Sequence, residues 1–172
     1  VYGIGAIGAV VAKNLETLEF RVTGWAQTKK PQLLFRQATG TVGFQRLIAA
    51  NSVHICLLPL TTHTKKLFTK EIFMKMPKGA YFINAGRGEQ VDEAGLLDAV
   101  QTGHLSGAAL DVFCEEPLPK AHPFWNEEKI SIWPHVAAQT NPETVIEQIL
   151  ESIYAIKSGR IPKNVVDPIR QY

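Results

Sequence analysis

The sequence predicts a doubly wound α/β fold, in which helices cover both faces of a parallel sheet. Glycine and proline residues divide the chain into pieces, and apolar runs of strand length alternate with segments whose apolar residues recur at helical spacing. A glycine-rich loop directly before the first helical segment favours the same fold. The chain has 172 residues, 45% hydrophobic and 20% charged, which suits one well-cored globular domain.

The expected elements follow one another along the whole chain. Helices are expected at residues 6–18, 43–50, 69–76, 92–102 and 142–157, and strands at residues 20–25, 53–58, 80–84, 105–110 and 129–133. Asp92 is placed to cap the fourth helix, and Gly103 and Gly159 follow the ends of the last two. Residues 53–58 form a nearly continuous apolar run, which predicts a strand buried on both faces. The tail, residues 160–172, shows little periodicity, and we expect it to pack on another part of the protein.

Composition and charge exclude several classes of protein. Eighteen Lys and Arg residues against 16 Asp and Glu residues leave a net charge of +2, too balanced for a general nucleic-acid binder. No run approaches the roughly 18 apolar residues of a membrane span. The two cysteines, Cys56 and Cys114, form no CxxC pair and no metal-ligand spacing with histidines. These features favour a reducing, cytoplasmic location without a metal site.

The glycine loop has the sequence GIGAIG, from Gly3 to Gly8, and it opens directly onto the first expected helix. In a Rossmann-type unit the first glycine makes a tight turn, the second lets the backbone approach a pyrophosphate, and the third allows close packing of helix on strand. Runs of small residues at helix starts also arise from packing alone, which is the alternative. Such a loop follows a strand, and here only Val1 and Tyr2 precede it. We therefore expect a truncated first strand.

The loop after the second expected strand bears on cofactor preference. An NAD-binding unit carries an acidic residue about 20 positions after the glycine loop, where it binds the ribose 2′-OH. Residues 26–30 read AQTKK and contain no carboxylate. An amide, a hydroxyl and two cations favour the 2′-phosphate of NADP over NAD. Alternatively, Lys29 and Lys30 are only solvated surface charges.

Three polar residues follow three different expected strands. Arg87, Glu116 and His135 come after residues 80–84, 105–110 and 129–133, and ligands in open α/β sheets bind beyond such strand ends. Arg87 could bind a carboxylate and polarise a neighbouring carbonyl, His135 could exchange a proton with it, and Glu116 could orient the imidazole. Each has an alternative: Arg87 caps a turn, Glu116 is solvated and interchangeable with Glu115, and His135 is a structural loop histidine.

Two longer segments carry a resemblance to a known family. FINAGRGEQVDEAGLLDAVQTGHLSGAALDVFCEEPLP and PHVAAQT resemble the signatures of the D-isomer-specific 2-hydroxyacid dehydrogenases, and the match runs from Gly3 to about Gly159. Trp25 with its polar loop, LLPLTTHTKKLF and PHVAAQT are most similar to the glyoxylate/hydroxypyruvate reductase A branch. The resemblance implies an oxidoreductase that moves hydride between a nicotinamide cofactor and a short 2-keto acid such as glyoxylate or hydroxypyruvate. It also implies a homodimer.

The resemblance assigns roles residue by residue. It implies that Arg87 anchors the substrate, that His135 is the acid and base with Glu116 as its partner, and that Asp111 binds the nicotinamide carboxamide. The cofactor-lining residues that it implies, together with those of the glycine loop, are Gly5, Ala6, Ile7, Gly8, Trp25, Ala26, Gln27, Thr28, Lys29, Leu58, Pro59, Thr64, Ala85, Gly86, Arg87, Asp111, His135 and Ala137.

The sequence also departs from the family's pattern. Gly86 stands where alanine is common, and Gln27 stands where the branch often has an arginine. Family members carry a substrate domain before the glycine loop. We therefore interpret residues 1–141 as an N-terminally incomplete NAD(P)-binding domain and residues 142–172 as a helix and tail that return to the substrate domain. A catalytically incompetent dinucleotide-binding or sensing module remains the alternative function.

Overall fold

The computed structural model describes residues 1–169 and residue 171, and it divides the chain into two compact units, Val1–His135 and Val136–Tyr172. The first unit holds the helices α1 (Ala6–Thr17), α2 (Gly40–Ala50), α3 (Lys70–Lys75) and α4 (Glu93–Gln101), with short 3-10 helices at Pro123–Asn126 and Gly88–Gln90. Its strands are β1 (Thr23–Ala26), β2 (Arg36–Thr39), β3 (Val53–Cys56), β4 (Ala80–Asn84), β5 (Leu105–Leu110) and β6 (Ile130–Ile132). No described helix is long and apolar enough to cross a membrane.

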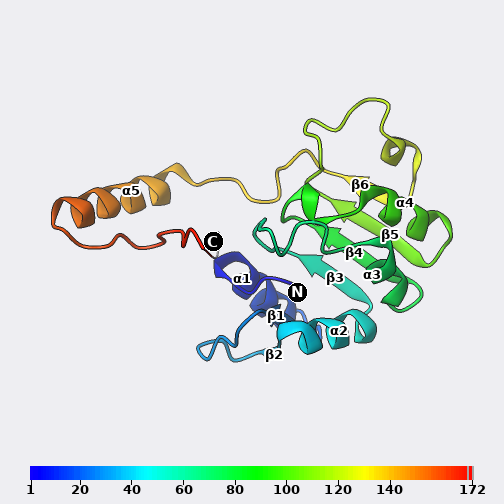
Figure 1. Ribbon diagram of the computed structural model, residues 1–172, viewed down its shortest axis with the longest axis horizontal. Helices are drawn as coiled ribbons and strands as arrows, with labels where there is room; N and C mark the ends of the chain where they lie inside the picture. The colour runs from blue at the N-terminus through cyan, green and yellow to red at the C-terminus, as the bar shows by residue number, and fades with distance from the viewer. Residues whose placement is uncertain (170, 172) are drawn as a thin grey trace. The chain divides into compact units, whose positions relative to one another are not determined.

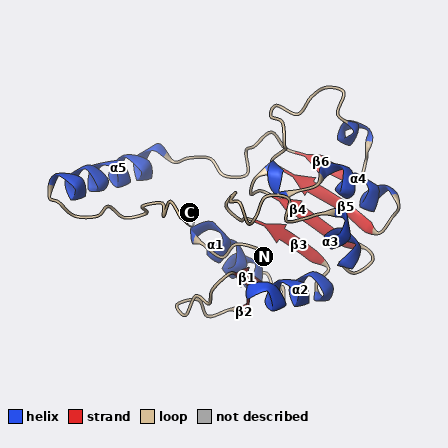
Figure 2. Ribbon diagram, in the orientation of Figure 1, coloured by secondary structure: helices blue, strands red, loops and turns tan. Residues whose placement is uncertain are grey.

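All strand pairs of the first unit are parallel. β1 pairs with β2, and β3, β4, β5 and β6 pair in that order, as Figures 1 and 2 show for β3 to β6. Tyr2 forms parallel bridges to Trp25 of β1 and to Cys56 of β3, and thus joins the two groups of strands. The N–H of Tyr2 donates to the carbonyl of Ile55 at 2.8 Å, and its own carbonyl accepts from Leu57 at 2.8 Å. Tyr2 therefore occupies the place of a first strand, which confirms the expected Rossmann-like fold.

An aromatic cluster forms the centre of the core. Tyr2 and Phe82 are fully buried, and Phe68 lies between them with ring centroids 5.2 Å from Tyr2 and 4.9 Å from Phe82. Phe73 of α3 lies 5.2 Å from Phe82, so the helix layer is held to the sheet by aromatic packing. Helices α2, α3 and α4 are neighbours in that layer. Aromatic packing thus anchors β4, the strand that precedes Arg87, to the helix layer.

The local predictions held for most elements and failed at three points. The strand at Arg36–Thr39 was not expected, and it pairs with β1 along four residues. The strand at Val53–Cys56 is not buried on both faces: Val53 is exposed and Ile55 half-buried, because only alternate residues of this strand face the core. Asp92 stands at the N-cap of α4, but its side chain makes no capping hydrogen bond.

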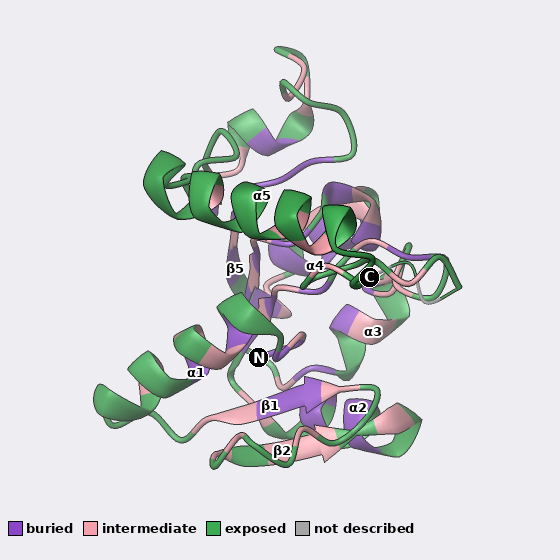
Figure 3. Cartoon of the chain, turned by 90° about the vertical axis from the view of Figure 1, so that its left-hand side faces the viewer, coloured by how far each residue is buried: buried purple, intermediate pink, exposed green. Residues whose placement is uncertain are grey.

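The second unit consists of α5 (Pro142–Lys157) and the segments on either side of it. The side chain of Asn141 caps the helix by accepting from the N–H of Glu143 at 3.0 Å, and Gly159 follows the helix end with φ +67°. No residue of α5 is buried, and the helix is green along nearly its whole length in Figure 3. The division of the chain falls after His135, whereas the sequence suggested a boundary after Asn141. Residues 170 and 172 of the expected tail lie outside the described residues.

Candidate active site

The ends of three neighbouring strands meet at one edge of the sheet. The N–H of Asp111, directly after β5, donates to the carbonyl of Asn84 at the end of β4 at 2.9 Å. The N–H of His135, after β6, donates to the carbonyl of Asp111 at 2.9 Å. This ladder of backbone hydrogen bonds brings the turn that contains Arg87 and the residue His135 to the same edge, as expected for the carboxyl ends of parallel strands.

His135 and Glu116 form a close pair at this edge. Nδ1 of His135 lies 2.7 Å from Oε2 of Glu116, and a carboxylate can only accept, so Nδ1 carries the shared proton. The other carboxylate oxygen, Oε1, accepts from the N–H of Phe113 at 3.0 Å. The backbone of His135 is left-handed, with φ +55°, so the chain leaves the extended path of β6 at this residue. With Nδ1 committed to Glu116, Nε2 is the nitrogen that can exchange a proton with a substrate.

The electrostatics of the pair favour an ionised carboxylate. Partial burial raises the pKa of Glu116, but hydrogen bonds from His135 and from the N–H of Phe113 outweigh it, and the charge of Arg87 adds to them. The net result is a Glu116 pKa below its usual range. The structure thus brings His135 and Glu116 into contact, and the charge of Arg87 acts on the same carboxylate.

Arg87 lies in the turn that follows β4. Its Nη1 donates to the carbonyl of Gly86 at 2.7 Å, and its backbone N–H donates to Oε1 of Gln90 at 2.9 Å. The side-chain amide of Asn84 donates to the carbonyl of Arg87 at 3.1 Å. The side chain of Arg87 is exposed. Turn-capping contacts therefore coexist with a guanidinium that is open to a ligand.

Gly88 sets how closely this turn approaches Glu116. A Cβ atom on Gly88 would overlap the carbonyl of Phe113 and the nitrogen of Cys114, so the peptide between those residues lies directly on the glycine. The next peptide N–H upstream, that of Phe113, holds the carboxylate of Glu116. Gly88 thereby permits the Arg87 turn and the segment bearing Glu116 to touch.

Gln90 is a site residue that the sequence did not indicate. It is fully buried, and its Nε2 donates to the carbonyls of Leu58 and Pro59, both at 3.0 Å. Its Oε1 accepts from the N–H of Arg87 at 2.9 Å and from the thiol of Cys56 at 3.3 Å. Gln90 therefore ties the end of β3 to the Arg87 turn. A single polar residue in GRGEQVDE produces no periodic signal, so only the three-dimensional contacts identify it.

The glycine loop fits a dinucleotide by two separate features. Gly3 has φ +90°, and a Cβ atom on Gly8 would overlap the carbonyl oxygen of Gly3, so these two glycines allow the loop to fold tightly under α1. Around Gly5, in contrast, a Cβ atom would meet nothing within 4 Å. Gly5, Ala6 and Ile7 are exposed at the N-terminus of α1, where backbone N–H groups lack helical partners and attract anions. The open space at Gly5 is where a pyrophosphate would approach.

The segment after β1 keeps polar groups exposed. Gln27, Thr28 and Lys29 are exposed, and Ala26 is half-buried at the strand end. Within the described residues neither Lys29 nor Lys30 takes part in an ion pair, so their charges remain available to an anion.

The side chain of Trp25, by contrast, lies in the core. It is 8% exposed, and its indole N–H donates to the carbonyl of Gly40 at 2.9 Å. A contact between Trp25 and a cofactor would therefore come from its backbone.

The remaining predicted cofactor residues lie mainly in the turns after β3 and β4. Leu58 is buried and Pro59 exposed, and the hydroxyl of Thr64 donates to the carbonyl of Pro59 at 2.6 Å, which closes the turn between them. Ala85 is half-buried and Gly86 buried. Asp111 is buried beside His135, whereas Ala137 belongs to the second unit, and its contact with the cofactor stays a prediction.

A mostly apolar cavity of about 390 Å³ adjoins the His135–Glu116 pair. Its other walls are Phe113, Pro117, Leu118, Trp125, Ile132, Trp133 and Pro134. The indole N–H of Trp125 donates to the carbonyl of Pro119 at 2.9 Å, which fixes that ring at the cavity's edge. The pair is therefore bordered on one side by apolar groups.

Other titratable residues serve the structure. His54 is buried between Tyr2, whose hydroxyl is 2.8 Å from Nδ1, and the carbonyl of Asn51, 2.9 Å from Nε2. Burial lowers the pKa of His54 to about 4. Partial burial and the charges of Glu93 and Glu89 raise the pKa of the Cys114 thiol to about 11. No cluster of metal-ligating side chains occurs among residues 1–169 and 171.

The sequence of the first unit matches a known family. Residues 1–137 match the model for the D-isomer specific 2-hydroxyacid dehydrogenase, NAD binding domain. The chain belongs to the D-isomer specific 2-hydroxyacid dehydrogenase family. Glyoxylate/hydroxypyruvate reductase A of Yersinia enterocolitica is 37% identical over 172 residues, and the protein of the same name from Serratia proteamaculans is 37% identical over 178. The chain spans 55% of the length of each of these relatives.

Solved structures of dehydrogenases from this family share the fold. A family member from Xanthobacter autotrophicus Py2, in complex with NADPH and MES, is 38% identical with a TM-score of 0.96 over 99% of this chain and 71% of that chain. The NADPH-dependent glyoxylate/hydroxypyruvate reductase of Sinorhizobium meliloti, in complex with NADP and sulfate, is 31% identical with a TM-score of 0.93 over 99% of this chain and 55% of that chain. The family of this chain and its Rossmann-like fold are thus established.

Proposed function

We propose that this chain is the cofactor-binding part of an oxidoreductase that transfers hydride between NADP(H) and a short 2-keto or 2-hydroxy acid, such as glyoxylate or hydroxypyruvate. The observation that carries the proposal is the 2.7 Å contact between His135 and Glu116, with the guanidinium of Arg87 close enough to lower the pKa of Glu116. The names of the relatives support the same class of substrate.

The three residues have complementary roles in this reaction. Arg87 binds the substrate carboxylate through paired N–H donors and stabilises negative charge on the neighbouring carbonyl oxygen. His135 donates a proton from Nε2 to that oxygen during reduction and removes it during oxidation. Glu116 holds the ring by Nδ1 and favours its protonated form. When bound, a reduced nicotinamide dinucleotide supplies the hydride.

We infer a preference for NADPH over NADH from the segment after β1. Residues 26–29 hold no carboxylate that would repel a 2′-phosphate, and among the residues that the structure describes neither Lys29 nor Lys30 has a partner in an ion pair. The complexes of the Xanthobacter and Sinorhizobium proteins with NADPH and NADP support this preference. The homodimer and the cytoplasmic location expected from the sequence also stay proposals.

The experiment that tests the function follows the oxidation of NADPH on addition of glyoxylate or hydroxypyruvate, with the protein and its His135→Ala variant. We expect turnover by the protein and a loss of about 100-fold or more in the variant, with NADPH affinity retained. Saturable NADPH binding without turnover of any short 2-keto acid would favour the sensing module instead.

A further inference from the structure

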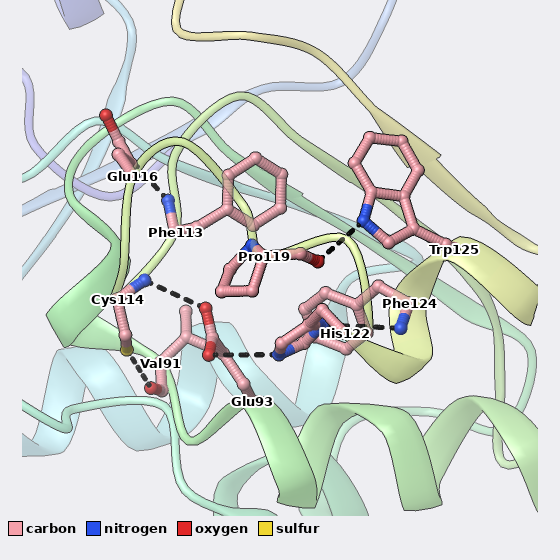
Figure 4. A network of polar contacts seen from close by, with 9 residues as sticks. All are labelled: Val91, Glu93, Phe113, Cys114, Glu116, Pro119, His122, Phe124 and Trp125. Atoms are coloured by element: carbon pink, nitrogen blue, oxygen red, sulfur yellow. Dashed lines mark hydrogen bonds and ion pairs between the residues drawn. The ribbon is translucent and has the colours of Figure 1, made fainter.

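We propose that Glu93 is a positioning residue, which keeps the carboxylate of Glu116 at hydrogen-bond distance from His135. This inference concerns the geometry of the site, and it rests on the proposed function for its catalytic consequence. Glu93 is the first residue of α4 and lies outside the residues assigned to the site by any sequence pattern. Figure 4 shows its side chain between two parts of the carboxylate loop, which we define as residues 113–122.

The two oxygens of Glu93 contact opposite ends of the carboxylate loop. Oε1 accepts from the backbone N–H of Cys114 at 2.9 Å, and Oε2 lies 3.6 Å from Nε2 of His122. The other ring nitrogen of His122, Nδ1, accepts from the N–H of Phe124 at 3.3 Å, so the ring proton is on Nε2 and faces Glu93. A single side chain on a helix thus joins the beginning and the end of the loop (Figure 4).

Glu116 depends on the part of the loop that Glu93 holds. The carboxylate of Glu116 accepts from the N–H of Phe113, and Glu93 binds the N–H of the next residue, Cys114. Gly88 lies against the peptide group between Phe113 and Cys114, the group whose N–H Glu93 binds. Glu93 therefore holds the peptide group next to the one that donates to Glu116, and through it the position of the Glu116 carboxylate.

Side-chain exposure also indicates a defined contact rather than a loose surface pair. The side chains of Glu93 and His122 are 18% and 20% exposed, far less than those of Asp98, also on α4, and its ion-pair partner Lys70 of α3, at 43% and 52%. Exposed ion pairs hold their partners weakly, whereas a partly buried carboxylate that accepts a backbone N–H constrains the backbone. Asp98 is accordingly a matched control, because it is a carboxylate of α4 that makes an ion pair away from the loop.

The test measures the pKa of the Glu116 carboxyl group by NMR in Glu93→Ala, Glu93→Gln and Asp98→Asn variants of this chain. Loss of a negative charge alone lowers the pKa of a neighbouring carboxyl group, whereas loss of position weakens the bonds from His135 and Phe113 and raises it. Removing Glu93 therefore lowers the pKa of Glu116 if Glu93 acts only through its charge, and raises that pKa if Glu93 holds the loop in position. We expect Glu93→Ala to raise the pKa of Glu116 toward its usual range, and Glu93→Gln, whose amide oxygen can still accept from Cys114, to keep it low. Asp98→Asn should leave it unchanged.

A fall or no change in the pKa of Glu116 in Glu93→Ala would overturn the proposal. If Glu93→Ala does not fold, the His122→Ala variant is measured instead, because it removes the second contact of Glu93 with the loop. A rise in the pKa of Glu116 in this variant supports the proposal, and no change overturns it. In turnover assays, Glu93→Ala should lower kcat more than it raises KM, and it should add no further loss in a Glu116→Gln background. The NMR titration needs no turnover, so failure of the proposed function and failure of this inference are distinguishable.

Discussion

Oε2 of Glu116 and Nδ1 of His135 are 2.7 Å apart, although the two residues are 19 positions apart and follow different strands. Each is held by a backbone hydrogen bond at its own strand end, Glu116 from the N–H of Phe113 and His135 to the carbonyl of Asp111. Their contact therefore depends on the register of the parallel sheet. Because the contact uses Nδ1 of His135, Nε2 is the ring nitrogen available for chemistry.

Replacing Glu116 by glutamine tests the value of that contact. A neutral amide cannot stabilise the imidazolium and can either donate to Nδ1 or accept from it, so the ring loses its fixed proton position. We expect kcat for 2-keto acid reduction to fall about 100-fold or more while NADPH affinity stays the same. Glu115→Gln, at the exposed neighbouring position, is the control and should retain full activity.

Alanine substitutions at two glycines separate cofactor binding from packing. At Gly8 the new Cβ atom would overlap the carbonyl of Gly3, so we expect Gly8→Ala to lower the free energy of unfolding by about 3 kcal/mol or more. At Gly5 the space is open, and a loss below about 1 kcal/mol is expected. Gly5→Ala should nevertheless weaken NADPH binding, measured by fluorescence titration. Unchanged affinity in Gly5→Ala would mean that the loop serves packing alone.

A carboxylate at position 26 tests the cofactor preference. Ala26→Asp places a negative charge at the end of β1, where it would repel a 2′-phosphate and could bind a ribose hydroxyl. We expect the ratio of NADPH to NADH affinity to fall by about tenfold or more, an energy of about 1.4 kcal/mol. Gln45→Asp, which adds the same charge at an exposed position of α2, should leave the ratio unchanged. An equal effect of both variants would contradict the assignment of this segment.

Burial of His54 predicts acid sensitivity of the fold. Its pKa is about 4 in the folded chain and about 6.5 in an unfolded one, so the unfolded state binds more protons between these values. The free energy of unfolding should therefore fall as the pH drops from about 6.5 to about 4, by roughly 1 kcal/mol per pH unit from this residue. Above that window His54 adds no pH dependence. Urea unfolding at several pH values should show a smaller decline in His54→Gln, whereas His63→Gln, at an exposed position, should behave as the unchanged protein does.

The periodic elements could be predicted from sequence because their burial pattern is local. Residues 80–84, 105–110 and 142–157 have the same bounds in the structure as in the prediction. Strand β2 could not be predicted, because Arg36–Thr39 lacks an apolar alternation and owes its conformation to pairing with β1. The exposure of Val53 likewise depends on which neighbours cover the strand, which no run of apolar residues specifies.

The sequence likewise indicates some residues of the candidate site and not others. Strand-end reasoning predicts that Arg87, Glu116 and His135 converge. The structure brings Glu116 and His135 within 2.7 Å of each other, and the catalytic roles of all three stay predictions. Gln90 and Glu93 could not be predicted, since each acts through contacts with backbone groups distant in sequence. Their roles depend on how turns meet in space, to which residue type and spacing give no guide.

The most direct measurement uses NADPH deuterated at the carbon that donates hydride, with hydroxypyruvate as the substrate and mass spectrometry of the product. We expect deuterium on the carbinol carbon of the hydroxy acid with the protein, and at least about 100-fold slower incorporation with His135→Ala at saturating NADPH. Binding of NADPH without transfer of deuterium, or equal transfer by the His135→Ala variant, would contradict the assignment of His135 and Glu116 as the acid–base pair of a 2-keto acid reductase.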